Sequence, residues 1–169
     1  EVLSQFPMVT HVVNVQGDEP LIDPQMIDFL ATNMIEQTGL KVATLIRRIE
    51  DAADLSNPNV VKVVINRNNE AMYFSRQAIP FVRDFPVDSW LEHGVYYKHV
   101  GMYAYTSQAL MAIEKLHMHP YEALEKLEQL TWIAHGLSIE CFETNMESIG
   151  IDTEEDLKAV TSMIAELED

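Results

Sequence analysis

Short apolar runs alternate with an amphipathic segment in the first part of the chain. Residues 9–16 (VTHVVNVQ) are rich in valine and end at a turn with glycine and proline, which predicts a buried strand. The next segment has Asp23 as a helix N-cap, Pro24 at the first helical position and apolar residues at helical spacing. A second apolar run, KVATLI at 41–46, follows this helix. The strand–helix–strand order predicts an α/β sandwich with a mixed, mainly parallel sheet.

The rest of the chain continues the mixture of strands and helices. A polar turn separates two apolar runs, which predicts a hairpin. Leu124, Leu127, Leu130 and Ala134 are spaced as the buried stripe of a helix. The further strands are expected at 60–65, 71–75, 96–105 and 138–143, and the further helices at 107–116, at 121–134 and from about Thr153.

Composition limits the classes of protein that fit. A chain of 169 residues, 47% hydrophobic, matches one domain, 1–169, and has no apolar run of the roughly 20 residues needed to cross a bilayer. The 11 basic and 27 acidic residues give a net charge of −16, which opposes binding to nucleic acid or to anionic membranes. The single cysteine, Cys141, cannot form an internal disulfide. We therefore expect a cytoplasmic protein that binds neither nucleic acid nor membrane.

Two acidic positions are candidates for a metal site. Asp18 lies in QGDEP at the carboxyl end of the first expected strand, where ligands of open α/β sheets bind. Asp152 lies between a strand and the last helix. Two carboxylates can hold Mg²⁺ together with substrate phosphates. The residues alone leave the alternatives open, because Asp18 also fits a solvated turn and Asp152 a helix N-cap.

A small set of basic groups stands out in this acidic chain. Arg76, Arg83, Lys98 and His99 could capture a carboxylate or a phosphate, since guanidinium groups bind such anions in a bidentate manner. Surface salt bridges are the ordinary alternative for the arginines. His99 lies within an apolar strand, so the pattern by itself favours a core histidine.

Six ordered blocks resemble one enzyme family over nearly the whole chain. They are VVNVQGDEPLI (12–22), NPNVVKVV (57–64), YFSRQAIPFVRD (73–84), KHVGMYAY (98–105), LEKLEQL (124–130) and GIDTEEDL (150–157). This series is similar to that of the 3-deoxy-manno-octulosonate (Kdo) cytidylyltransferases. The resemblance implies a Rossmann-like nucleotidyltransferase fold and a homodimer.

The resemblance also implies an activity and a site. Members of the family couple CTP with Kdo, a sugar acid of bacterial lipopolysaccharide, and release pyrophosphate, a reaction that depends on positioning and electrostatics. By resemblance, Asp18 and Asp152 have the catalytic role of holding Mg²⁺. The substrate-binding residues implied in the same way are Gln16, Arg76, Arg83, His99, Tyr103, Glu128 and Gln129.

The sequence departs from the family pattern in two respects. Thr106 and Thr131 stand where arginine is usual, so each could alter the pocket rim or only a surface contact. The strand and basic phosphate loop with which the family opens have no counterpart in these 169 residues. We therefore expect the chain to correspond to the later two thirds of the enzyme and to be inactive alone.

Three alternatives for the function remain. The sugar could be 8-amino-Kdo, or another acid of the sialic or legionaminic type. The chain could instead be a truncated, non-catalytic paralogue that binds a sugar acid or dimerises.

Overall fold

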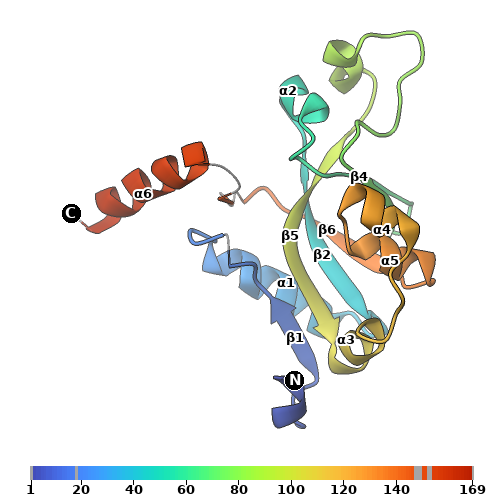
Figure 1. Ribbon diagram of the computed structural model, residues 1–169, viewed down its shortest axis with the longest axis vertical. Coiled ribbons are helices and arrows are strands. Elements are labelled where there is room, and N and C mark those ends of the chain that lie inside the picture. The colour runs from blue at the N-terminus through green and yellow to red at the C-terminus, as the bar shows by residue number, and fades with distance from the viewer. Residues whose placement is uncertain (1, 18, 147–149, 152–153, 169) are drawn as a thin grey trace.

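The computed structural model describes residues 2–17, 19–146, 150–151 and 154–168, and its strands form one sheet (Figure 1). The strands are β1 (His11–Asn14), β2 (Val42–Arg48), β3 (Lys62–Ile65), β4 (Ala71–Ser75), β5 (Tyr97–Thr106) and β6 (Ile139–Glu143). The α-helices are α1 (Pro24–Glu36), α2 (Ala52–Ser56), α3 (Ser107–Ile113), α4 (Pro120–Glu125), α5 (Gln129–Ala134) and α6 (Glu154–Glu168). Two 3-10 helices, η1 (Leu3–Gln5) and η2 (Val87–Glu92), complete the described elements.

The order of the first predicted unit, strand–helix–strand, is confirmed, but the expectation of a buried first strand is wrong, because β1 has three half-buried residues and an exposed Asn14. Asp23 caps α1, because its side chain accepts a hydrogen bond from the backbone N–H of Gln25 at 2.8 Å, and Pro24 begins the helix. Met26, Leu30 and Met34 form the buried face of α1. β1 and β2 then run in the same direction, since both are antiparallel to β5.

The sheet is mixed, as predicted, but the expectation that it is mainly parallel is wrong for the described strands. Its order is β4-β3-β5-β2-β6, with β1 also paired to β5. β5 is antiparallel to β1, β2 and β3, the β3–β4 hairpin is antiparallel, and β2–β6 is the parallel pair. The cause is that the later strand β5 lies between β1 and β2, which a local strand–helix–strand pattern cannot reveal.

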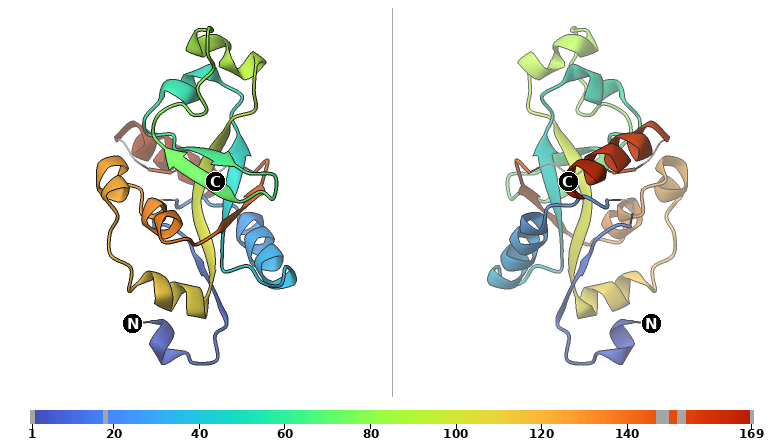
Figure 2. Two further views of the ribbon diagram at one scale, coloured as in Figure 1. Left: turned by 90° about the vertical axis from the view of Figure 1, so that its right-hand side faces the viewer. Right: turned by 90° about the vertical axis from the view of Figure 1, so that its left-hand side faces the viewer.

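Helices cover both faces of the sheet. α1 packs on one face through a cluster that includes Leu45 and Met102. α3 and α5 lie on the other face with a cluster that includes Ile46, Tyr103 and Trp132. Figure 2 shows the resulting three layers. Alternate residues of β2 and β5 thus enter opposite cores, as the pleat of a strand requires.

A third, smaller cluster holds the end of the molecule that carries α2 and η2 (Figure 1). Trp90 and Tyr96 stack with ring centroids 6.2 Å apart, and Leu55 of α2 is fully buried beside them. Val82 packs partly buried against the same cluster. The chain between β4 and β5 is therefore anchored away from the two main cores.

The helix expected over 121–134 is interrupted. Lys126 adopts a left-handed conformation with φ 57° at the end of α4, and a new helix, α5, starts at Gln129. Leu127 and Leu130 are buried as expected, but Leu124 is 79% exposed and Ala134 is also exposed, so the assignment of these two residues to the buried stripe is wrong. Because the helix is broken at Lys126, Leu124 belongs to α4 and does not continue the buried face that Leu127 and Leu130 form.

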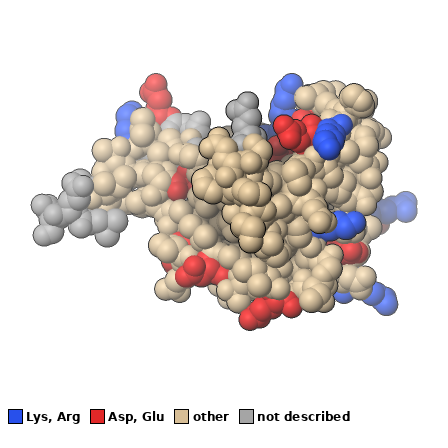
Figure 3. All heavy atoms as spheres, turned by 90° about the horizontal axis from the view of Figure 1, so that it is seen from below, with Lys and Arg blue, Asp and Glu red and all other residues tan. Residues whose placement is uncertain are grey.

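Basic and acidic side chains both occur on the face of the molecule that is seen from below. Seen from below, charged side chains are dispersed over a mainly uncharged face (Figure 3). Within the described part of the chain, no helix has the length and apolar character needed to cross a bilayer.

A pair of leucine substitutions tests this packing. Leu30 is fully buried between α1 and the sheet, so Leu30→Ala is expected to lower the free energy of unfolding by about 2–5 kcal/mol through lost burial and a cavity. Leu124→Ala is the matched control, expected to cost about 0.5 kcal/mol or less. Urea unfolding followed by circular dichroism measures both. Equal costs for the two variants would contradict the packing.

Candidate functional site

A cleft of about 1060 Å³ lies along β5, between the sheet and the α4–α5 segment. Its lining comes from distant parts of the sequence and includes six of the residues that the resemblance implied. These are Gln16, Arg76, His99, Tyr103, Glu128 and Gln129. The fold therefore brings together side chains separated by more than a hundred positions into one site.

The floor of the cleft depends on a glycine in β5. A Cβ atom built at Gly101 would lie 3.1 Å from Oε1 and 3.2 Å from Cδ of Gln16. Gln16 follows β1, and its amide group can lie over β5 only because Gly101 has no side chain. This close approach places a neutral donor and acceptor at the floor.

His99 lies partly buried in the cleft wall. Its Nε2 is 2.9 Å from Oγ1 of Thr44, and its ring makes an edge contact with Phe74 at a centroid distance of 5.2 Å. Burial lowers the pKa of His99 from 6.5 to about 4. The imidazole is therefore neutral near pH 7.

Tyr103 provides a buried hydroxyl without a hydrogen-bond partner among the described residues. The side chain is 1% exposed and lines the cleft beside His99, with ring centroids 5.1 Å apart. Burial, followed by the nearby Tyr105 and Glu128, raises the pKa of Tyr103 well above 10. Because an unpaired buried hydroxyl costs about 1–3 kcal/mol, this group is suited to a ligand that supplies the missing hydrogen bond.

The opposite wall is formed where α4 ends and α5 begins. Gln129 is 3% exposed at the start of α5, and Glu128 precedes it at the cleft. Desolvation, and then the Glu122 carboxylate, raise the pKa of Glu128. This wall offers amide and carboxyl groups, which hydrogen-bond hydroxyls.

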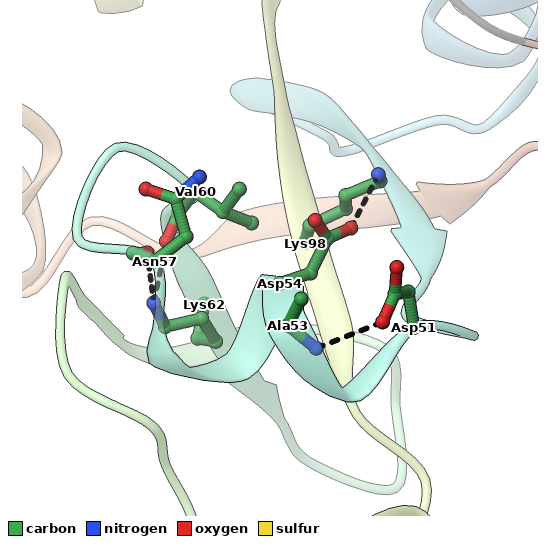
Figure 4. Close-up of polar contacts among 7 residues, drawn as sticks. All are labelled: Asp51, Ala53, Asp54, Asn57, Val60, Lys62 and Lys98. Atoms are coloured by element: carbon green, nitrogen blue, oxygen red, sulfur yellow. Dashed lines mark hydrogen bonds and ion pairs between the residues drawn. The ribbon is translucent and has the colours of Figure 1, made fainter.

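A buried lysine holds the loop at one side of the cleft (Figure 4). Lys62 on β3 is fully buried, and its Nζ donates to the backbone carbonyls of Asn57 at 2.9 Å and Val60 at 2.6 Å. Burial lowers the pKa of Lys62, although Asp54 and Glu125 oppose this effect. The lysine fixes the backbone that carries the lining residues Asn59 and Val60.

Two further cations of the cleft have defined partners. Lys98 Nζ lies 2.9 Å from Oδ2 of Asp54, a contact drawn in Figure 4. Arg76 donates from Nε to the carbonyl of Glu125 at 2.8 Å and from Nη1 to that of Pro58 at 2.9 Å. Arg76 thus joins the loop of Pro58 to the end of α4 and holds its guanidinium at the rim.

Arg83 does not belong to this cleft, contrary to the expectation from the resemblance. Its side chain is 90% exposed, and its Nε lies 3.8 Å from Oδ1 of Asp84. The neighbouring Val82 packs against the third cluster, so Arg83 faces solvent at the end of the molecule that carries η2.

The two expected metal ligands, Asp18 and Asp152, lie outside the described residues. Glu19 and Gly150, which are close to them in sequence, both line the cleft. Glu19 and Gly150 come from opposite parts of the sequence, so two distant stretches of the described chain meet at the cleft. No group of three or more potential ligands occurs among the residues that the structure describes.

Thr106 and Thr131, the two departures from the family pattern, serve the fold. Thr106 accepts a hydrogen bond from the N–H of Ala109 at 3.1 Å and caps α3. Thr131 is 4% exposed, donates to Glu122 and accepts from the N–H of His119. Neither side chain is part of the described cleft lining.

Sequence reasoning overlooked several lining residues. Arg47, Asn59 and Lys126 line the cleft and were not predicted as site residues. Arg47 had a detectable signal, because it follows the apolar run 41–46 at a strand's carboxyl end. The position of Lys126 depends on the helix break, which the sequence pattern did not indicate.

The comparison with known families decides what the chain is related to. The profile of a family described as cytidylyltransferase matches residues 1–148. The chain belongs to the cytidylyltransferase family. Relatives named 3-deoxy-manno-octulosonate cytidylyltransferase are 47% identical over 89% of this chain in Cytophaga hutchinsonii and 44% identical over 98% in Psychromonas ingrahamii. The resemblance inferred from the six sequence blocks is confirmed.

A solved structure confirms the nucleotidyltransferase fold of this cytidylyltransferase chain. A CMP:2-keto-3-deoxy-manno-octonic acid synthetase complexed with CTP matches with a TM-score of 0.86 at 36% identity, over 98% of this chain and 65% of that protein. A putative glucose-1-phosphate thymidylyltransferase from Bacillus anthracis has the related fold, with a TM-score of 0.52 at 18% identity. The chain spans 60% of the Cytophaga relative and 62% of a 42% identical relative from Parabacteroides distasonis.

The protonation of His99 gives a test that needs no substrate. The pKa of His99 is about 4 in the native chain and about 6.5 in the unfolded chain. Between these two pH values the unfolded chain binds a proton at His99 and the native chain does not, so acidification favours unfolding. This contribution to stability is complete above pH 6.5 and is lost as the pH falls toward 4. Partial access to solvent limits it to about 1–2 kcal/mol.

The measurement compares urea unfolding of the wild type and His99→Gln near pH 7 and near pH 5. We expect the wild type to lose more stability than the variant on acidification by that amount. NMR titration of the His99 ring gives the pKa directly. A midpoint near 6.5 would contradict the buried environment.

Proposed function

We propose that this chain is part of a cytidylyltransferase that activates Kdo with CTP to give CMP-Kdo and pyrophosphate, for lipopolysaccharide synthesis. One observation carries the proposal: Gln16, Arg76, His99, Tyr103, Glu128 and Gln129 line a single cleft. The names of the relatives and the CTP complex of the structural neighbour support the same activity.

The chemistry of the cleft suits a sugar acid. Its basic residues, Arg47, Arg76, Lys98 and Lys126, are suited to the carboxylate of the sugar and to phosphate. Its neutral groups, which include Tyr103, suit the many hydroxyls. The lining also includes Glu19, Glu122 and Glu128, so an anionic ligand would be bound by direct contact with the basic side chains and not by an excess of positive charge over the whole cleft.

The proposed reaction is an in-line group transfer. The C2 hydroxyl oxygen of Kdo forms a bond to the α-phosphorus of CTP, the bond from that phosphorus to the bridging oxygen breaks, and pyrophosphate leaves. The hydroxyl proton passes to solvent water in the same process. The residues of the cleft would hold the sugar so that its C2 hydroxyl is aligned with the leaving group.

We propose Asp18 and Asp152 as the ligands of Mg²⁺. Bound there with the substrate phosphates, the ion would neutralise negative charge that develops on them. Because CTP is a cytoplasmic nucleotide, we propose the cytoplasm as the site of the reaction.

We also propose a homodimer, on the family resemblance. Large apolar side chains such as Phe81, 75% exposed, and Met8, 89% exposed, are of the kind that a subunit interface covers. Analytical ultracentrifugation of the protein from the complete reading frame is expected to give twice the monomer mass. A monomer at micromolar concentration would contradict this.

The activity is tested by pyrophosphate release with CTP and Mg²⁺. Kdo, 8-amino-Kdo and a sialic acid are offered in parallel to the protein encoded by the complete reading frame. We expect release with Kdo and its loss with EDTA or in Asp18→Asn. If only another sugar acid is turned over, that acid and not Kdo is the substrate. If a sugar acid binds and none is turned over, the result favours a non-catalytic module.

Gly101→Ala tests the floor of the cleft. The new Cβ would displace the flexible side chain of Gln16, so the fold should be little affected while kcat/KM for the sugar acid falls at least about tenfold. Gly94→Ala is the control, because its Cβ would make an ordinary contact of 3.5 Å with Tyr96. If kcat/KM for the sugar acid is unchanged in Gly101→Ala, the position of the Gln16 side chain over Gly101 is not needed for activity.

A further inference from the structure

Thr44 occupies an irregular point of the sheet directly under the cleft. It is fully buried on β2, where it pairs with Tyr103, while the next residue, Leu45, pairs with Val100. Two residues of β5, Gly101 and Met102, therefore have no counterpart on β2. This bulge leaves backbone carbonyls of β5 outside the regular ladder.

The hydroxyl of Thr44 fills that irregularity. Its Oγ1 donates to the carbonyl of Met102 at 2.7 Å and is 3.4 Å from the carbonyl of Val100. A hydroxyl has a single hydrogen, and the nearer carbonyl receives it. Toward His99 the oxygen can then act only as an acceptor.

This restriction determines the tautomer of His99. Nε2 lies 2.9 Å from the Thr44 oxygen and must carry the hydrogen that it donates. In a neutral imidazole the other nitrogen, Nδ1, then carries the lone pair. Burial holds the ring neutral near pH 7.

We infer that Thr44 is a positioning residue that fixes His99 as a neutral hydrogen-bond acceptor, through Nδ1, for a hydroxyl of the substrate. This inference rests on the proposed function of the cleft as a sugar-acid site. The unpartnered hydroxyl of Tyr103 is close by and supplies a donor. Together the two groups provide an acceptor and a donor for a polyol, and neither attracts a carboxylate as a cation would.

The pairing has a consequence for the orientation of the ligand. A carboxylate placed at the bare Nδ1 would meet a lone pair, which is repulsive. The acid group of the sugar must therefore bind at the cationic part of the cleft, and its hydroxyl-bearing portion at His99 and Tyr103. Thr44 contributes to this selection without touching the substrate.

The first test uses nitrogen-15 NMR of the ligand-free chain. The His99 ring signals are assigned by their loss in His99→Gln, since the chain has 6 histidines. We expect Nε2 to show the shift of a protonated nitrogen and Nδ1 that of a bare one. Thr44→Val removes the acceptor while keeping the side-chain shape, and should change the tautomer populations. The reverse tautomer in the wild type, or no change in Thr44→Val, would overturn the inference.

The second test uses kinetics of the protein from the complete reading frame. Thr44→Val should raise the KM for the sugar acid about tenfold, as expected for one disrupted hydrogen bond, with a smaller effect on kcat and on the KM for CTP. Thr44→Ser retains the hydroxyl and should restore the wild-type tautomer and most of the affinity. If Thr44→Ser instead behaves as Thr44→Val, the methyl packing is what matters and the inference fails.

A double-mutant comparison separates a structural role from a positioning role. If Thr44 acts through His99, Thr44→Val should add little to the KM effect of His99→Gln. Fully additive effects would mean that Thr44 acts on the sheet alone. The NMR result does not depend on the substrate, so it stands or fails separately from the proposed activity.

Discussion

The pairing of β5 with its neighbours is the constraint on which the rest of the structure depends. β2 runs along one side of β5, and the other side is shared, because β3 pairs near Tyr97 and β1 pairs from Tyr103 to Thr106. A strand held on both sides has little freedom to shift its register. The bulge at Gly101 is therefore fixed in place, and the residues around it become the floor and wall of the cleft.

The charges of the molecule follow from the same arrangement. The chain is strongly acidic, yet its cleft gathers several of its cations and holds two of them, Arg76 and Lys98, by hydrogen bonds or an ion pair. Next to them lies a desolvated region, where His99 is neutral and the Tyr103 hydroxyl stays protonated. The cleft thus combines groups suited to an anion with groups suited to hydroxyls, and a sugar acid carries both.

Much of the fold could be predicted from local signals. The Asp23–Pro24 start of α1, the β3–β4 hairpin and the approximate bounds of the strands came from caps, turns and apolar runs. The order of the strands in the sheet could not be predicted from local signals, because β5 lies between β1 and β2 in space but follows both of them far along the sequence. The break at Lys126 also escaped prediction, because a left-handed lysine has no composition signal of its own.

The candidate site shows the same division. The chemical pattern alone left His99 as a core residue and Arg76 as a surface cation, and the family resemblance was needed to propose both as site residues. The structure places both at the cleft and leaves Arg83 outside, because Val82 next to it packs on a separate cluster. Thr44 gave no signal in the sequence, since its role depends on the bulge in the strand opposite.

The most direct test of the account is a crystal structure of the protein from the complete reading frame with CTP and Kdo bound. The account predicts the sugar in the cleft along β5, with hydroxyls within hydrogen-bonding distance of Tyr103 Oη and His99 Nδ1 and the carboxylate near the cations. A sugar bound elsewhere, or bound with its carboxylate at His99, would contradict it.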